Sequence, residues 1–227
     1  MTDHVTSIHD SHRHTDAPPQ TRPVAVIDIG SSSIRMAIGE ILSDGSIRLL
    51  EALSHDVDLG HDTFTRGRIN RKTTEGCVAV LLSYGKLLAE YGITRPDQVR
   101  VVATSAVREA NNRLEFLDRV YVATGLEIEP IDEAEVNRIT YLGVQPLIEN
   151  HPALGDAQSI VIEVGGGSTE ILLVQAGDVI HSNSYQLGSQ RLHKSLEPAP
   201  RAAVVEMMRS EVRRTMERVR DAVKLRY

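Results

Sequence analysis

The chain has 227 residues, of which 41% are hydrophobic, 4% aromatic and 25% charged, and its formal net charge is −6. This composition is ordinary for a globular protein, and with so few aromatic residues the core must consist mainly of Val, Ile, Leu and Ala, as in α/β proteins. The negative charge argues against general nucleic-acid binding, so a phosphate ligand would need a local site.

The N-terminal segment and the hydropathy pattern give expectations about location. No apolar run reaches the roughly 20 residues that span a bilayer, and the His-rich segment 1–22 lacks the pattern of a signal peptide. We therefore expect a cytoplasmic protein without a membrane partner, with a disordered tail over 1–22. The single cysteine, Cys77, fits a reducing compartment and is expected to be a buried structural thiol.

In chain order, the hydrophobic pattern predicts alternating strands and helices of an α/β protein. Strands are predicted at 24–28 and 34–41, extended chain at 46–59, a helix at 71–91, a strand at 98–103, a helix from Asn112 to Gly125, a strand at 127–131, a helix at 132–150, strands at 159–164, 170–174 and 179–185, and a helix at 202–225. Asn112 is expected to cap its helix, and Asp132 with Glu135 has the form of a capping box.

A repeat organises these elements. The segment Asp28-Ile-Gly-Ser-Ser-Ser-Ile-Arg resembles Glu163-Val-Gly-Gly-Gly-Ser-Thr-Glu, and each follows one buried strand and precedes another. A repeated strand-turn-strand predicts two similar lobes that face each other, the first over 23–132 and the second over 133–227. Little chain follows the second turn, so the second lobe is expected to be incomplete.

The two turns have the chemistry of a phosphate site. Glycine permits close approach of the backbone, and successive N–H groups form a nest for anions. The hydroxyl groups of Ser31, Ser32, Ser33, Ser168 and Thr169 add hydrogen-bond donors. Asp28 and Glu163, at the strand ends, are suited to hold Mg²⁺ directly or through water, because Mg²⁺ prefers oxygen ligands.

A third element, Thr104 to Ala110, follows the strand at 98–103, where α/β proteins commonly bind ligands. Its Arg108 is predicted either to clamp a phosphate or to form a surface ion pair with Glu109 or another nearby acid.

Together, three segments resemble the Ppx/GppA family of exopolyphosphatases and guanosine-pentaphosphate phosphatases, within the actin-like ATPase superfamily. They are Asp28 to Arg35, Ala103 to Asn111, and Glu163 to Glu170, and weaker matches extend the resemblance over about 23–195. The resemblance implies two ribonuclease-H-like lobes around a cleft and Mg²⁺-dependent hydrolysis of polyphosphate or guanosine pentaphosphate. It assigns phosphate contacts to Ser31, Ser33, Arg35, Arg108, Gly165, Gly166, Gly167, Ser168 and Glu170, and a phosphate or metal contact to Asp28.

The sequence departs from the family pattern at the catalytic position. Alignment through Tyr141-Leu-Gly-Val puts Val136 where the family has its water-activating glutamate. Valine accepts no proton, and a positioned general base contributes roughly 10²–10⁴-fold to a rate. Glu135 is the candidate replacement, although one helical step turns a side chain by roughly 100° and its capping role is the alternative. In addition, Glu163 replaces the usual aspartate.

Two functions therefore remain open from the sequence: a phosphohydrolase impaired at Val136, with Glu135 as its base, or a non-catalytic module that binds polyphosphate or an alarmone. A kinase-like or actin-like ATPase is a third, weaker hypothesis. The helix at 202–225 is expected to pack on its own lobe or to pair with a second copy in a homodimer.

Overall fold

A computed structural model describes residues 21–151, 153–154, 157–196 and 200–224. The predicted tail over 1–22 lies almost wholly outside these residues. The element bounds are β1 Arg22–Ile29, β2 Ser33–Ile41, β3 Ile47–Asp56, α1 Leu59–Arg66, α2 Arg71–Glu90, η1 Pro96–Gln98, β4 Val99–Ala103, α3 Ser105–Arg108, α4 Arg113–Thr124, β5 Ile128–Pro130, α5 Glu133–Glu149, β6 Gln158–Val164, β7 Thr169–Gln175, β8 Asp178–Tyr185, α6 Ser189–Leu196 and α7 Arg201–Lys224.

The first lobe is built on a five-stranded sheet of order β3-β2-β1-β4-β5. The strands β1, β2 and β3 form an antiparallel meander, whereas β4 and β5 join in parallel beyond β1. Ile27, Ile29, Ile34, Met36 and Ile38 are all buried, because alternate residues of a strand point to the same face. That face supports the main hydrophobic core.

The helix α2 covers this core, and the prediction of a helix here is confirmed. Its N-cap Asn70 accepts a hydrogen bond from the Thr73 N–H at 2.8 Å. One stripe of the helix is buried and includes Cys77, which is wholly inaccessible to solvent. The predicted burial of Cys77 is confirmed, and this burial raises the pKa of its thiol to about 12, which disfavours the thiolate.

The second lobe has a three-stranded antiparallel sheet of order β6-β7-β8, which repeats the meander β1-β2-β3. Within the described residues, nothing pairs with the outer edge of β6, whereas the equivalent edge of β1 pairs with β4. Ile160, Ile162 and Val164 on β6 are more than half exposed, so the expectation of a buried strand before the second turn is wrong: this edge of the sheet has no paired strand among the described residues. The second lobe is thus the smaller of the two in the described chain, as the sequence predicted.

The repeat extends further than the sequence showed. Each meander is followed by an eight-residue helix, α1 or α6, and then by a long helix, α2 or α7. The expectation of extended chain over 46–59 is wrong at its end, because β3 stops at Asp56 and α1 begins at Leu59. The two short helices contact each other across the lobes.

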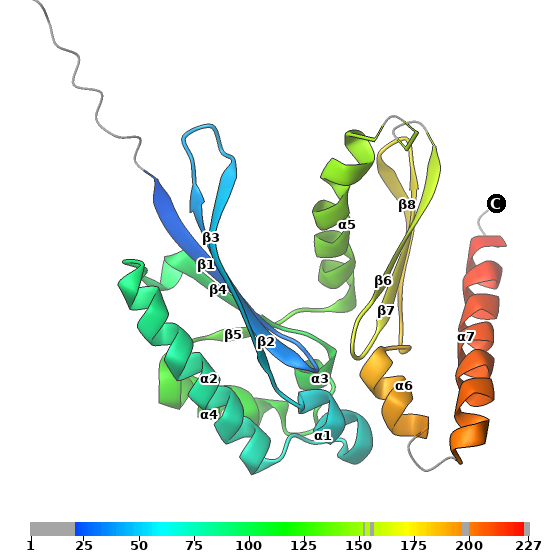
Figure 1. The fold of residues 1–227 in the computed structure, drawn as a ribbon, viewed down its shortest axis with the longest axis horizontal. Helices are drawn as coiled ribbons and strands as arrows, with labels where there is room; N and C mark the ends of the chain where they lie inside the picture. Colours follow the sequence, from blue (N-terminus) through cyan, green and yellow to red (C-terminus); the bar gives the residue numbers. More distant parts are fainter. Residues whose placement is uncertain (1–20, 152, 155–156, 197–199, 225–227) are drawn as a thin grey trace, which may run out of the picture.

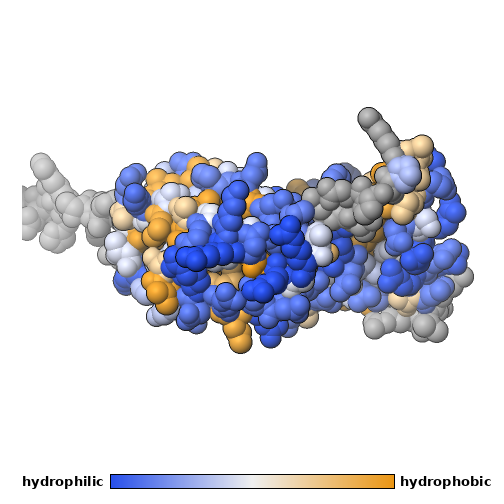
Figure 2. All heavy atoms as spheres, turned by 90° about the horizontal axis from the view of Figure 1, so that it is seen from below, coloured by the Kyte–Doolittle hydropathy of each residue, from blue (hydrophilic) through white to orange (hydrophobic). Residues whose placement is uncertain are grey.

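The helix α5 lies between the two sheets and packs on the second one, and α7 lies on the opposite side of that sheet (Figure 1). Val219 of α7 packs against Ile171 and Tyr185, so the helix docks on its own lobe. Pairing with a second copy and the division at 132/133 into two domains stay predictions. Hydrophilic residues cover most of the face shown in Figure 2. Among the described helices, none is long and apolar enough to cross a membrane.

The expected cap at Asn112 is only partly correct. Asn112 stands at the N-cap of α4, but its side chain makes no capping bond. Its amide instead exchanges two hydrogen bonds of 2.9 Å with the backbone of Ile69 and so ties α4 to the start of α2. Asp132 does cap α5, since its carboxylate accepts the Glu135 N–H at 2.8 Å.

Candidate functional site

The two turns face one cavity of about 130 Å³ between the lobes. It is lined by Asp28, Gly30, Ser31, Ser32, Ser33, Arg35, Thr104, Ser105, Arg108, Val136, Glu163, Gly165, Gly166, Gly167, Ser168 and Glu170. Twelve of these are residues that the sequence singled out for phosphate or metal contacts, namely Asp28, Ser31 to Ser33, Arg35, Arg108, Glu163, Gly165 to Gly167, Ser168 and Glu170. Segments more than 130 residues apart in the chain thus meet at one place.

Both turns close with the same hydrogen bond. The Gly30 N–H donates to the Ser33 carbonyl at 3.0 Å, and the Gly165 N–H donates to the Ser168 carbonyl at 2.9 Å. The sequence repeat is therefore a structural repeat at the level of single hydrogen bonds. Each closed turn places its central residues at the end of a strand, β1 in the first lobe and β6 in the second.

The first turn of α6 orients the second Gly-rich turn. The N–H of Ser189 donates to the Gly165 carbonyl at 2.9 Å, and the N–H groups of Gln190 and Arg191 donate to the Gly166 carbonyl at 2.9 and 3.1 Å. In a trans peptide the C=O and N–H point in opposite directions. The N–H groups of Gly166 and Gly167 therefore point away from α6, as an anion nest requires.

The first turn is held in the same way by the start of α1. The Gly60 N–H donates to the Ser31 carbonyl at 2.8 Å, and the Val57 N–H donates to the Ser32 carbonyl at 2.9 Å. The N–H groups of Ser32 and Ser33 consequently point away from these donors. Each lobe uses the backbone around a short helix to fix the carbonyl groups of its turn.

Arg191 joins the second turn to the first lobe. Its Nε donates to the Gly167 carbonyl at 2.7 Å, and its terminal nitrogen donates to both carboxylate oxygens of Glu109 at 2.8 Å. The guanidinium also lies over the Phe64 ring, 4.1 Å from its centroid. Since Glu109 and Phe64 belong to the first lobe, one side chain links both lobes at the cavity.

We expect Arg191→Ala to destabilise the chain by about 1–3 kcal/mol, because it removes charge-assisted hydrogen bonds and leaves the Glu109 carboxylate without its partner. Arg119→Ala is the matched control, since Arg119 forms a similar two-bond pair with Glu75 on the exposed surface. The Arg119→Ala control should lose less free energy of unfolding, because an exposed ion pair contributes little. Urea unfolding measures both variants, and equal losses would contradict a special role for Arg191.

The second turn is pressed against the first lobe. A Cβ on Gly166 would lie 3.0 Å from the Ser31 Cβ, and one on Gly167 would overlap the Ser105 side chain and the Phe64 ring. The hydroxyl groups of Ser31 and Ser105 are 3.3 Å apart beneath this contact. Glycine at 167 therefore permits the lobes to approach closely enough to share one cavity.

Four charged residues stand at equivalent positions of the two hairpins. Asp28 is opposite Arg35 in the register of β1 and β2, and Glu163 is opposite Glu170 in that of β6 and β7. Burial raises the pKa of Asp28, while the Arg35 charge opposes this shift and the Glu163 charge adds to it. Burial is also the main cause of the raised pKa of Glu170.

Asp28 and Glu163 are suited to bind a cation. Asp28 Oδ1 is buried and has no hydrogen-bond partner among the described residues, and Glu163 lies across the same cavity. The described residues contain no group of three His, Cys, Asp or Glu side chains that could hold a metal alone. Mg²⁺ is commonly held by one or two carboxylates together with phosphate oxygens of the substrate. Asp28 and Glu163 therefore fit Mg²⁺ that arrives with a phosphate ligand.

Glu170 forms hydrogen bonds that hold the second turn. Its Oε1 accepts hydrogen bonds from the hydroxyl groups of Ser168 at 2.7 Å and Ser184 at 3.0 Å, and the side chain is buried. Its predicted contact with phosphate stays a prediction, because a carboxylate repels a phosphate unless a proton or a cation intervenes.

We expect Glu170→Gln to stabilise the chain at about pH 8, because glutamine keeps an acceptor oxygen and removes a buried charge. Burial raises the folded-state pKa of Glu170, so ionisation costs stability as pH rises from its ordinary value of 4.5 through the raised pKa. The gain should vanish below that ordinary value. Urea unfolding across this range tests the trend. Glu135→Gln should instead lower the free energy of unfolding at about pH 8, since the Arg138 guanidinium lowers the pKa of Glu135 and so favours its charged form.

Arg108 lines the cavity and is anchored from the other side. Its Nη1 donates to the Ile131 carbonyl at 2.9 Å, and its Nη2 lies 3.7 Å from Glu133. The alternative of an ion pair with a nearby acid is confirmed for Glu133, whereas Glu109 is the wrong partner because it pairs with Arg191. The guanidinium is thus held at the cavity, which is compatible with the predicted phosphate clamp.

Two predicted site residues are not brought to the cavity. The Thr169 hydroxyl is buried and donates to the Leu187 carbonyl, so it fastens β7 to the segment before α6. The Glu135 carboxylate accepts two hydrogen bonds from Arg138, at 2.7 and 2.8 Å, and lies 3.6 Å from Arg100. Because one helical step separates it from Val136, Val136 faces the cavity in its place.

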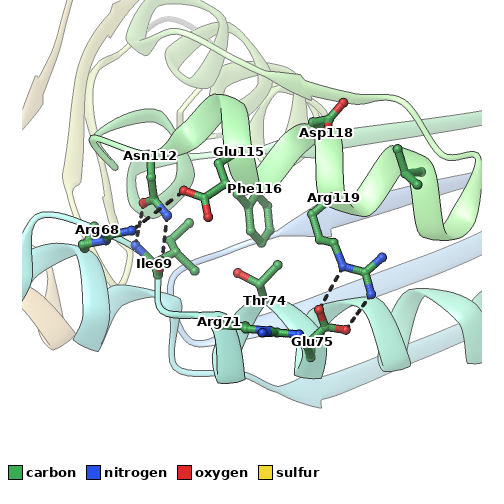
Figure 3. Close-up of a pocket in the computed structure, with 11 residues that line it drawn as sticks. Arg68, Ile69, Arg71, Thr74, Glu75, Asn112, Glu115, Phe116, Asp118 and Arg119 are labelled. Atoms are coloured by element: carbon green, nitrogen blue, oxygen red, sulfur yellow. Dashed lines mark hydrogen bonds and ion pairs between the residues drawn. The ribbon is translucent and has the colours of Figure 1, made fainter.

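A larger cavity of about 600 Å³ lies elsewhere, between the start of α2 and α4 (Figure 3). Arg119 pairs with Glu75 across it, and Arg68 lies 3.8 Å from Glu115. Its cationic and acidic side chains come from the first lobe alone, and it contains neither of the two turns. We therefore place the candidate site at the smaller cavity between the lobes.

Sequence reasoning missed the residues that support the turns. Arg191 and Gly188 lie in the segment Leu187 to Leu192, where only a resemblance was noted, and Thr140 lies on α5 without any motif. A signal for the first two was present, since a glycine and an arginine follow the second hairpin at the start of a helix. Thr140 has no such signal, because its contact with Glu163 depends on the fold.

Comparison with known proteins agrees with the geometry. The model of the Ppx/GppA phosphatase family matches residues 40–227. A Ppx/GppA family member from Aquifex aeolicus is 32% identical with a TM-score of 0.63, and the match covers 78% of this chain and 55% of that one. An exopolyphosphatase from Cytophaga hutchinsonii is 26% identical with a TM-score of 0.69, covering 77% and 53%.

A further structure of the Aquifex aeolicus enzyme is 29% identical with a TM-score of 0.67, covering 88% of this chain and 64% of that one. The chain thus spans about 53% to 64% of the length of these three relatives. Within the described residues it has two α/β lobes, and the sheet of the second is smaller than that of the first. With more than half of its length matched, the chain belongs to the Ppx/GppA phosphatase family.

Proposed function

We propose that the chain binds a string of linked phosphates between its two turns and hydrolyses the terminal phosphate slowly. Inorganic polyphosphate and guanosine pentaphosphate are the candidate ligands. The observation that carries this proposal is the convergence of both turns and Arg108 on one cavity. Backbone N–H groups and arginine guanidinium groups are common phosphate-binding groups in proteins.

Mg²⁺ is part of the proposal. Asp28 and Glu163 would hold it, directly or through water, together with oxygen atoms of the ligand. When bound, the cation would neutralise charge on the phosphates as the terminal group is transferred. The protein's own contribution is to fix the phosphate chain: the turns present N–H groups, and Arg108 and Arg35 add positive charge at the cavity.

A non-catalytic binding module is the second candidate. It is favoured by one observation, the placement of Val136 at the cavity and of Glu135 in an ion pair with Arg138. Neither residue offers a free carboxylate to water at that point of α5. The two candidates share the binding step and differ only in turnover.

Binding and turnover can be tested separately. Calorimetry with Mg²⁺ and either tripolyphosphate or guanosine pentaphosphate should show binding, and Arg108→Gln should weaken it about tenfold or more, because a charged hydrogen bond is worth about 1.5–3 kcal/mol. Arg119→Gln removes the same charge at the cavity of Figure 3 and should leave affinity unchanged. Phosphate release then separates the candidates, and absence of binding would contradict both.

A further inference from the structure

The Glu163 carboxylate is drawn toward α5. The Thr140 hydroxyl donates a hydrogen bond to Glu163 Oε2, which ties β6 to the helix. Thr140 lies four residues after Val136, so the two side chains share one face of α5. Val136 and Glu163 both line the phosphate cavity. The carboxylate therefore lies beside the apolar position that Val136 creates.

Glu163 is the carboxylate best placed to meet water at this cavity. Three acidic side chains line it within the described residues. Asp28 is largely buried, and Glu170 is buried and accepts hydrogen bonds from two serine hydroxyl groups. Glu163 is exposed, and its Oε2 accepts the hydrogen bond from Thr140, so its other carboxylate oxygen faces water.

A second cavity supplies access for water. It has a volume of about 690 Å³, lies between α5 and the first sheet, and shares Asp28, Thr104, Val136 and Glu163 with the phosphate cavity. Most of its other lining residues are apolar, including Val26, Val102 and Val144. A water molecule that enters through it meets Glu163 as a hydrogen-bond acceptor where the two cavities join.

We propose that the Glu163 carboxylate, held by Thr140 against α5, orients the attacking water at the position that Val136 leaves without an acceptor. The inference rests on the proposed hydrolysis. In that reaction the water oxygen bonds to the terminal phosphorus, the bond from that phosphorus to the bridging oxygen breaks, and the electron pair leaves with the shortened phosphate chain. The protons of the water pass to the released orthophosphate and the solvent.

Phosphoryl transfer needs a residue that positions the nucleophile more than it needs a strong base. A glutamate reaches one methylene farther than an aspartate, and at position 163 this extra length carries the carboxylate to Thr140. The residues at 136 and 163 should therefore be coupled. A glutamate at either of the two positions should be able to orient the water when the other position lacks one.

The test changes the length and the charge of the side chain at 163 and then measures its coupling to position 136. We expect Glu163→Asp to lower phosphate release from tripolyphosphate at least tenfold, because the shorter arm withdraws from Thr140. Glu163→Gln should lose less activity than Glu163→Asp, since its amide oxygen still accepts a hydrogen bond from water. In a Val136→Glu background, Glu163→Asp should cost less than threefold. Thr140→Val should lower kcat with KM unchanged.

Calorimetric Mg²⁺ affinity, measured with tripolyphosphate bound, is the readout that does not depend on turnover. We expect it to change less than threefold in Glu163→Gln. A tenfold loss of Mg²⁺ affinity together with lost turnover would overturn the inference, because Glu163 would then act by binding the metal directly rather than through water. Binding without any phosphate release by the unsubstituted chain would also overturn it and leave the binding module, whereas loss of binding itself would contradict the proposed function.

Discussion

Val136→Glu is expected to raise the rate of phosphate release by about 10²–10⁴-fold, the usual contribution of a positioned general base. Val136 lines the phosphate cavity from the first turn of α5, and the turns and Arg108 are already in place around it. A glutamate at 136 would bring a carboxylate to the bound phosphate chain without rearranging the backbone. Phosphate release from tripolyphosphate with Mg²⁺ measures the effect.

Ile139→Glu is the matched control for this gain. Ile139 is on the same helix and lines the second cavity, but it does not line the phosphate cavity. It adds the same charge to α5 and should leave the rate near that of the unsubstituted chain. A rise of less than threefold in Val136→Glu, with ligand binding retained, would show that the scaffold lacks more than one acceptor.

Much of the site could be predicted because it follows from local patterns. Asp28-Ile-Gly-Ser and Glu163-Val-Gly-Gly each join a hydrophobic strand to a tight turn, and the alternation of side chains along a strand fixes which way the turn faces. The repeat then implied that the two turns meet. The structure places Gly30 and Gly166 at one cavity, as this reasoning required.

The rest could not be predicted because it depends on contacts between distant residues. Glu135 and Val136 are neighbours in sequence, and only the packing of α5 decides which of them faces the phosphate cavity. The bond from Thr140 to Glu163 and the link from Arg191 to Glu109 join residues 23 and 82 positions apart. Thr169 was misjudged for the same reason, since its hydroxyl is taken by the Leu187 carbonyl.

Short elements were also missed, for a different reason. The helices α1 and α6 have eight residues each, too few for a clear periodic pattern. Their first turns bind the carbonyl groups of the two phosphate turns, so their stability comes largely from tertiary contacts. A helix of this kind contributes to function through its position and leaves little trace in composition.

Gly188→Ala is expected to weaken phosphate-chain binding at least tenfold and to destabilise the chain by about 1–3 kcal/mol through overpacking. A Cβ at 188 would overlap the backbone of Gly166 and Gly167, closer than real Cβ atoms approach. Backbone atoms have no alternative rotamer, so the Gly-rich turn or α6 must move. Either shift breaks the hydrogen bonds from Ser189 and Gln190 that orient the turn's N–H groups.

Gly85→Ala separates this effect from a general cost of replacing glycine. Gly85 is exposed in the middle of α2, and a Cβ there would meet no atom within 4 Å. That variant should be stabilised by about 0.5–1 kcal/mol, because alanine favours a helix over glycine. Calorimetry with tripolyphosphate and urea unfolding of both variants make the comparison. If Gly188→Ala kept its affinity within threefold, the hold of α6 on the second turn would not be what shapes the phosphate site.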